Sequence, residues 1–239
     1  MSKPPKIDRK ILRTPDEFVQ KGTQFLGKLS SSRMGLTPLL IAVGVVVVAF
    51  YAYDQWDNSK EQKAWTEYYG ATKVKEEEKW QKLEKVHQQW PSSRAGMLSA
   101  VELGDHYFDS SKKEVGKDLA KVSKDSDSAV EWYSKALQSK HLVPLEKQLL
   151  LINRANAWEL QSKWEQSLAD YQLAENTSAQ AKGLALLGEA RIYEAKGSTD
   201  KAIEVYQKTA TEFASTEYGK LAKNHIRRLK SPLFSVKKS

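Results

Sequence analysis

Residues 34–53, MGLTPLLIAVGVVVVAFYAY, form a run of 20 residues without a charged side chain. As a helix this run would be about 30 Å long, which matches the hydrocarbon core of a bilayer. Thr37 can cap such a helix, and Pro38 suits its first position, where the missing N–H costs little. The far end carries aromatic residues typical of a membrane interface: Phe50, Tyr51, Tyr53 and Trp56. The run therefore predicts one transmembrane helix over 34–53.

Two other interpretations of this run fit the sequence less well. Four consecutive valines and the lack of charge argue against a helix buried in a soluble core. A cleaved signal peptide would need an unusually long basic region before it, and no A-x-A site follows the apolar run. Basic residues outnumber acidic ones before the run, which by the positive-inside rule predicts a cytoplasmic N-terminus and a C-terminal body on the other side.

Residues 1–33 are predicted to form a basic cytoplasmic arm with a short amphipathic helix. Thr14 and Pro15 provide a helix start. Apolar or small residues then recur at helical spacing: Phe18, Gly22, Phe25, Leu26 and Leu29. The helix could lie on anionic lipid or bind a protein partner, or the arm could act only through its charge. The sequence leaves these alternatives open.

The rest of the composition excludes several classes of protein. The chain of 239 residues has no cysteine, which excludes disulfide frameworks, cysteine zinc sites and thiol nucleophiles. Its formal net charge of +8 comes from the two ends, since the middle of the chain is mildly acidic. A nucleic-acid surface would place basic and aromatic residues together across the folded body. We therefore expect a membrane protein that binds no nucleic acid.

A search for catalytic motifs finds little chemistry. No phosphate-binding, dinucleotide-binding or nucleophile-elbow motif is present, and the four histidines are scattered. Asp105, His106 and Asp109 are close together, but a metal site there would lack a third protein ligand of firm identity. An ordinary polar helix face is the preferred interpretation. The sequence predicts a protein that is not an enzyme, with no metal, no cofactor and no small-molecule substrate.

A pattern of apolar, small and aromatic residues repeats along the body, where no strand pattern is found. One copy consists of Leu151, Ala155, Trp158, Ser167, Tyr171 and Ala174. The next lies 35 residues on, at Leu186, Ala190, Tyr193, Ala202, Tyr206 and Thr209. An upstream copy, in which residues 110–128 are expected to enlarge the turn, consists of Ala100, Gly104, Tyr107, Ala129, Tyr133 and Ala136. The predicted fold class is all-α.

These residues resemble the tetratricopeptide repeat, a pair of antiparallel helices of about 34 residues. The resemblance implies an α-solenoid of tetratricopeptide-like helix pairs, the tetratricopeptide-repeat domain, over 91–230. It would follow membrane-proximal helices over 54–90 and precede a basic tail over 231–239. Tyr218, Leu221, Ala222, Ile226 and Leu229 suit the amphipathic capping helix that a solenoid needs at its open end.

The layout resembles one family more closely, because Trp90-Pro91-Ser92-Ser93-Arg94-Ala95 leads into Ala100-Val101-Glu102-Leu103-Gly104-Asp105. It is similar to the YfgM-type membrane-anchored tetratricopeptide proteins of Gram-negative bacteria. The resemblance implies a signal-anchor protein of the bacterial inner membrane with a periplasmic C-terminal domain. It further implies an ancillary Sec translocon subunit that passes emerging polypeptides to periplasmic chaperones. A scaffold for another envelope assembly, in division or secretion, is the alternative. The longer arm, the 110–128 insertion and the basic tail depart from the family.

In tetratricopeptide folds the first helix of each pair lines a concave groove, so the resemblance also implies a set of partner-binding positions. We expect unfolded or helical polypeptide segments, the Sec translocon or periplasmic folding factors to be the partners. A second possibility is that the chain's own helix over 216–229 covers the groove. The groove positions are Leu98, Val101, Asp105, Phe108, Leu149, Ile152, Asn156, Glu159, Leu184, Leu187, Arg191 and Glu194.

Overall fold

The computed structural model describes Gln24 and residues 37–231. Over residues 37–231 the chain forms nine helices and no strand, which confirms the all-α prediction. The chain divides into two compact units, Met1–Asn58 and Ser59–Ser239. Apart from Gln24 and Ser231, the predicted cytoplasmic arm and the basic tail lie outside the described residues.

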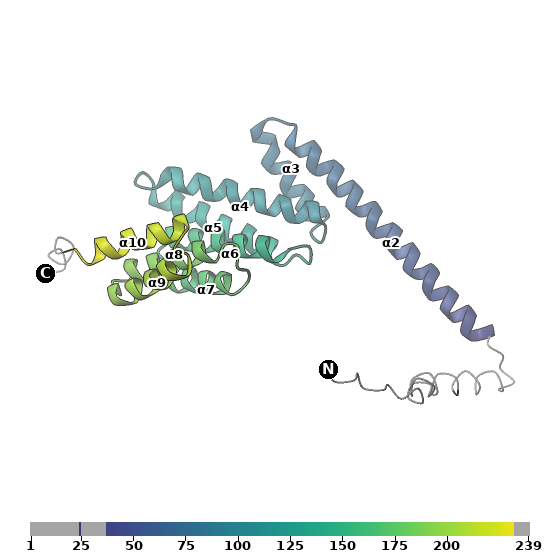
Figure 1. Ribbon diagram of the computed structural model, residues 1–239. Coiled ribbons are helices and arrows are strands. Elements are labelled where there is room, and N and C mark those ends of the chain that lie inside the picture. Colours follow the sequence, from purple (N-terminus) through teal and green to yellow (C-terminus); the bar gives the residue numbers. More distant parts are fainter. Residues whose placement is uncertain (1–23, 25–36, 232–239) are drawn as a thin grey trace, which may run out of the picture. The chain divides into compact units, whose positions relative to one another are not determined.

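Helix α2 (Thr37–Thr72) contains nearly all of the predicted transmembrane segment (Figure 1). It is long and apolar enough to cross a membrane, and the side chains of its apolar part are exposed. Residues 34–36 lie outside the described residues. The predicted boundary between residues 53 and 54 is not a structural break, because the helix continues unbroken for 36 residues. No proline follows Pro38 within it, and its first glycine beyond the apolar run is Gly70.

The second unit consists of successive helices, each packed against its neighbours in the chain. The even-numbered helices α4, α6, α8 and α10 also contact one another in that order, so they form one layer. Figure 1 shows helices α4 to α10 in teal, green and yellow. The helices are α3 (Glu76–Gln89), α4 (Arg94–Glu114), α5 (Leu119–Leu137), α6 (Pro144–Leu160), α7 (Trp164–Glu175), α8 (Lys182–Ala195), α9 (Thr199–Glu212) and α10 (Glu217–Leu229).

Local sequence signals set where the helices of the even-numbered layer begin. The side chain of Ser93 accepts a hydrogen bond from the backbone N–H of Gly96 and so caps α4. Pro144 occupies the first position of α6, where a missing N–H costs nothing. In the same turn, Glu146 accepts a hydrogen bond at 3.2 Å from the backbone N–H of Val143. These caps fix the register in which α4 and α6 present their side chains.

The repeated aromatic residues fill the core of the helix pairs. Tyr133 on α5, Tyr171 on α7 and Tyr206 on α9 are all fully buried. Small residues on the facing helices make room for them, and Gly104 of α4 lies directly against the ring of Tyr133. The sequence pattern of small and aromatic residues therefore marks true helix–helix contacts in this protein.

The stretch 110–128 is not the enlarged turn that the sequence predicts. Instead α4 continues to Glu114 and α5 begins at Leu119, so the extra residues lengthen both helices. Ser111 and Ser126 are buried between them, and their hydroxyl oxygens lie 2.7 Å apart. Ser110 donates a hydrogen bond to Asp125 at 2.6 Å. Small hydroxyl side chains thus join the two helices where a polar loop was expected.

Replacing Gly104 with alanine will destabilise the protein by about 1–3 kcal/mol, the usual cost of overpacking a core. A Cβ atom at this position would lie 2.6 Å from two ring atoms of Tyr133. Gly70→Ala is the matched control, since no atom lies within 4 Å of its added Cβ. That helical substitution should instead stabilise by up to about 1 kcal/mol. Urea denaturation followed by circular dichroism tests the contrast, and equal effects of the two variants would contradict it.

Candidate interaction groove

Exposed leucines recur at one position of successive even-numbered helices. Leu149 of α6 is 40% exposed, Leu184 of α8 37% and Leu221 of α10 46%, while Leu98 of α4 is half-buried. We call these four residues the leucine row. Because the four helices contact one another in order, the row crosses the whole layer. Three residues of the leucine row, Leu98, Leu149 and Leu184, are predicted groove residues. The fourth, Leu221, was expected only to belong to a capping helix.

Leu184 and Leu221 occupy equivalent positions, because the residue seven places after each of them makes the same kind of contact. Arg191 lies seven residues after Leu184 and forms an ion pair with Glu159 of the preceding even-numbered helix. Arg228 lies seven residues after Leu221 and forms the same kind of pair with Glu194. The sequence contains this shared spacing of leucine and arginine. The fourth leucine of the row, Leu221, could therefore have been predicted from it.

Part of the leucine row opens into an apolar pocket between α4 and α6. The pocket has a volume of about 250 Å³. Leu98 and Val101 of α4 and Leu149 of α6 line the pocket, and all three are predicted groove residues. Glu146 and Asn153 supply its polar rim. The structure thus brings together three of the five apolar groove positions of the first two predicted repeats, without Phe108 and Ile152. The full lining consists of Met97, Leu98, Val101, Leu142, Glu146, Leu149, Leu150 and Asn153.

Two predicted groove residues, Ile152 and Leu187, lie in the core. Ile152 is 3% exposed and Leu187 is 9% exposed, so a partner cannot reach either side chain directly. Leu187 packs in a cluster with Ala222 and Leu229 of α10. The helix over 216–229 therefore covers part of the predicted groove, as the second possibility anticipated. It leaves the leucine row exposed, and it adds a leucine of its own. Phe108 is half-buried against the core around Tyr133.

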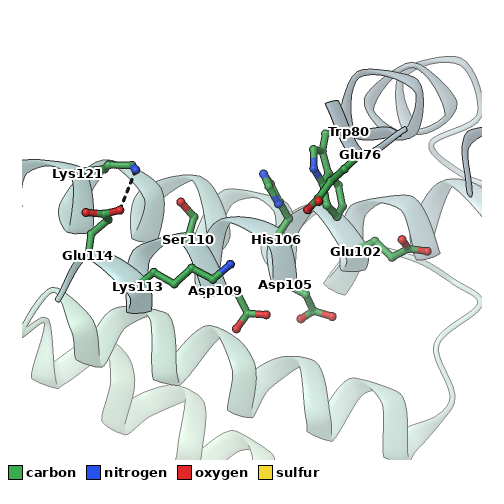
Figure 2. Close-up of a pocket in the computed structure, with 10 residues that line it drawn as sticks. All are labelled: Glu76, Trp80, Glu102, Asp105, His106, Asp109, Ser110, Lys113, Glu114 and Lys121. Atoms are coloured by element: carbon green, nitrogen blue, oxygen red, sulfur yellow. Dashed lines mark hydrogen bonds and ion pairs between the residues drawn. The ribbon is translucent and has the colours of Figure 1, made fainter. Parts of the chain in front are cut away.

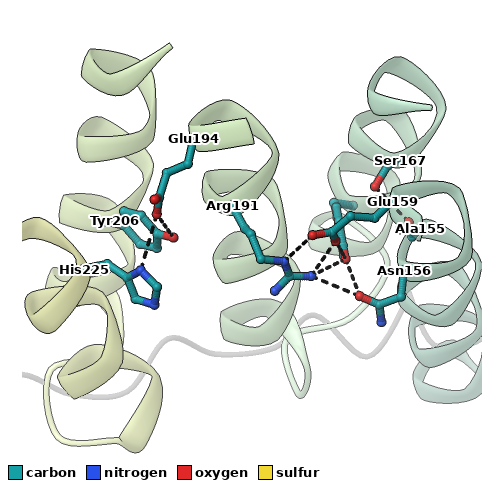
Figure 3. A network of polar contacts seen from close by, with 9 residues as sticks. Ala155, Asn156, Glu159, Ser167, Arg191, Glu194, Tyr206 and His225 are labelled. Carbon is teal, nitrogen blue, oxygen red and sulfur yellow. Dashed lines mark hydrogen bonds and ion pairs between the residues drawn. The ribbon is translucent and has the colours of Figure 1, made fainter. Parts of the chain in front are cut away.

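The predicted polar groove residues form what we call the polar ladder, a set of contacts that joins neighbouring even-numbered helices (Figure 3). Its central part lies between α6 and α8. Arg191 donates to both carboxylate oxygens of Glu159, at 2.7 and 2.8 Å, and to Asn156 at 3.1 Å. The buried Tyr171 donates its hydroxyl hydrogen to Asn156 at 2.5 Å. Paired charges of this kind hold the two helices together.

A similar arrangement lies between α8 and α10, and a single related hydrogen bond lies at α4. Tyr206 donates to Glu194 at 2.6 Å, and His225 and Arg228 of α10 contact the same carboxylate. Tyr133 donates to Asp105 at 2.7 Å. The predicted polar positions thus bind partners within the chain, so the polar ladder stiffens the helix layer about two helical turns along from the exposed leucines.

The pKa shifts of the donors in the polar ladder fit this structural role. Burial raises the pKa values of Tyr133, Tyr171 and Tyr206, so their hydroxyls stay protonated and remain donors at physiological pH. The hydrogen bonds to Glu159 raise the pKa of Arg191. Desolvation raises the pKa of Asp105, despite the hydrogen bond from Tyr133. The shift of Asp105 therefore opposes its role as an acceptor, while the shifts of the tyrosines and of Arg191 keep the donors protonated.

A second hollow of about 420 Å³ lies beside α4 and contains Asp105, His106 and Asp109 (Figure 2). The His106 ring stacks on Trp80 with ring centroids 3.9 Å apart, and burial lowers the pKa of His106. Lys121 pairs with Glu114 at 3.1 Å on the same wall. Within residues 37–231, no three His, Asp or Glu side chains are grouped so that they could hold a metal ion.

Comparison with known proteins gives no match to a family model, to a curated protein or to a solved structure. Outside α2, the exposed apolar surface of this chain includes the leucine row with the apolar pocket.

Proposed function

We propose that this chain is a non-enzymatic, membrane-anchored interaction protein whose leucine row binds apolar stretches of polypeptide. Its helices would form an α-solenoid of tetratricopeptide-like pairs. The observation that carries the proposal is the row itself, with leucines left exposed at one position of α6, α8 and α10. Exposed apolar rows beside a pocket are typical of surfaces that bind amphipathic helices or hydrophobic segments.

The groove chemistry favours weak binding with little sequence specificity. The leucines offer non-directional contacts, whereas the polar ladder on the same helices is already engaged within the chain. A surface with few polar groups to satisfy tolerates many sequences, because specificity comes largely from hydrogen bonds and charges that must match. A factor that handles many different polypeptides needs this kind of surface.

The proposed location is the bacterial inner membrane, with a single pass through α2. The basic arm would lie in the cytoplasm and the C-terminal body in the periplasm. The length and apolar composition of α2 support the anchor, and the excess of basic residues before it supports the orientation. The resemblance to YfgM-type proteins then favours an adaptor of the Sec translocon, which passes emerging polypeptides to periplasmic folding factors.

Chemical crosslinking of the full chain in native membranes tests this partner assignment. We expect the adducts to contain the Sec channel or a periplasmic folding factor. Either partner should be enriched at least about tenfold over the adducts of an unrelated single-pass protein. A preferential association of about 1.4 kcal/mol produces that enrichment. Recovery of only division or secretion components would contradict the adaptor role and favour the scaffold alternative. Mass spectrometry of the adducts distinguishes the two results without assuming which surface is used.

A further inference from the structure

The last helix, α10, carries a basic face separate from the leucine row. With a turn of about 100° per residue, Lys220, Lys223, Arg227 and Lys230 fall on one narrow side of the helix axis. All four side chains are exposed. The opposite side of the helix packs Ala222 and Leu229 into the core. The basic face is therefore a continuous stripe of cations on the surface.

Most of this positive charge is not neutralised by the chain. Lys220 forms an ion pair with Glu217 at 2.6 Å. Within residues 37–231, Lys223, Arg227 and Lys230 form no ion pair. By contrast, Lys196 at the end of α8 pairs with Glu165 of α7 at 2.7 Å. The stripe thus keeps a charge that a negatively charged surface can bind.

The sequence after α10 extends the same chemistry. From Lys220 to Ser239 there are seven basic residues and no acidic one. Leu233, Phe234 and Val236 stand between Lys230 and the pair Lys237-Lys238. Aliphatic and aromatic side chains among lysines are typical of segments that lie at a bilayer interface, where the apolar groups insert and the cations meet headgroups.

We propose that the basic face of α10 binds the anionic headgroups of the bilayer. The contact is independent of what the leucine row binds. Because α2 is long and apolar enough to cross a membrane, the bilayer is present at high effective concentration. Each basic residue at an anionic surface strengthens such a contact about fivefold. Lys223, Arg227 and Lys230 together contribute about a hundredfold.

The test uses the full chain in nanodiscs of phosphatidylcholine alone or mixed with phosphatidylglycerol. The chain has no cysteine, so Ser231→Cys gives a single labelling site at the end of α10. A fluorophore there should be quenched by brominated lipid in the anionic discs and only weakly in the neutral ones. Added salt should reduce the quenching as it screens the charges.

Two triple variants test whether the position of the basic residues on α10 matters, or only the total charge of the chain. Lys223→Gln with Arg227→Gln and Lys230→Gln should lower the bound-to-free ratio of α10 about a hundredfold. The matched control removes three exposed lysines that form no ion pair within residues 37–231, and it should leave quenching unchanged. Its substitutions are Lys113→Gln, Lys117→Gln and Lys124→Gln.

Several results would overturn the proposal. Equal quenching in neutral and anionic discs, or no quenching in either, would remove the role of anionic lipid. Quenching that survives the basic-face variant would remove the role of α10. A label that responds to soluble RNA or to polyglutamate, but not to phosphatidylglycerol, would assign the face to nucleic acid or to an acidic protein instead.

Discussion

Replacing Arg154 with methionine will lower the free energy of unfolding by about 3–5 kcal/mol, the usual cost of removing one partner of a buried ion pair. Arg154 of α6 donates two hydrogen bonds to Asp170 of α7, at 2.8 and 2.7 Å. It also donates to the hydroxyl of Ser134 on α5 at 3.0 Å. Asp170 is only 6% exposed, so its carboxylate would stay buried without a counter-ion. Urea denaturation of the full chain in detergent, followed by tryptophan fluorescence, measures the loss.

Two further variants give this prediction its control. Lys82→Met removes an exposed pair with Glu78 at 3.8 Å, and it should cost less than about 1 kcal/mol. Adding Asp170→Leu to Arg154→Met removes the stranded carboxylate and should recover part of the lost stability. If Arg154→Met cost no more than Lys82→Met, the ion pair would not be what holds α5, α6 and α7 together.

Much of the helical architecture was predictable from the sequence. The apolar run of α2 and the spacing of Tyr171 and Tyr206 are strong periodic signals, and the structure places helices at both. The end of α2 was harder to predict. The change from apolar to polar residues after Tyr53 marks a change of environment, and a helix can pass through such a change without a break.

The stretch 110–128 was misassigned because its serines and lysines are typical of loops. Propensity cannot show that Ser111 and Ser126 face each other between two helices, where a small hydroxyl group fits and finds a partner. Tertiary packing decided the outcome here. The same lengthening leaves Leu119 exposed at the start of α5.

The exposure of the predicted groove positions also depends on tertiary packing. Counting from the repeat pattern gave Leu149 and Leu184 as apolar groove positions without deciding their exposure, and the structure leaves both more than one-third exposed. The count also included Ile152 and Leu187, which face the core one helical turn away. Whether a side chain near the edge of a helix face is covered depends on the neighbouring helix, and α10 covers Leu187. The pattern of a single helix does not contain that information.

Replacing Leu149 and Leu184 together with aspartate will weaken polypeptide binding by about a hundredfold. The change removes apolar contact and forces two carboxylates to lose water on binding, which together cost roughly 3 kcal/mol or more. Both leucines are more than one-third exposed, so the fold should tolerate the change. The probe is a reduced, permanently unfolded polypeptide without net charge, added to the full chain in nanodiscs.

The matched control carries the same substitutions outside the leucine row. Leu119 of α5 is 78% exposed and Leu173 of α7 is 50% exposed, and neither lies on an even-numbered helix. The variant with Leu119→Asp and Leu173→Asp makes the same change of charge and removes at least as much exposed apolar surface. It should bind the probe as the unmodified chain does, and circular dichroism should show that both double variants remain helical.

The dissociation constant of the unfolded probe for these two double variants, measured side by side at low and high salt, tests the central claim most directly. The claim predicts a loss of about a hundredfold for Leu149→Asp with Leu184→Asp, no change for the control pair, and little effect of salt on the unmodified chain. Equal affinities for the two double variants, or binding that disappears when salt is added, would show that the leucine row does not hold the polypeptide.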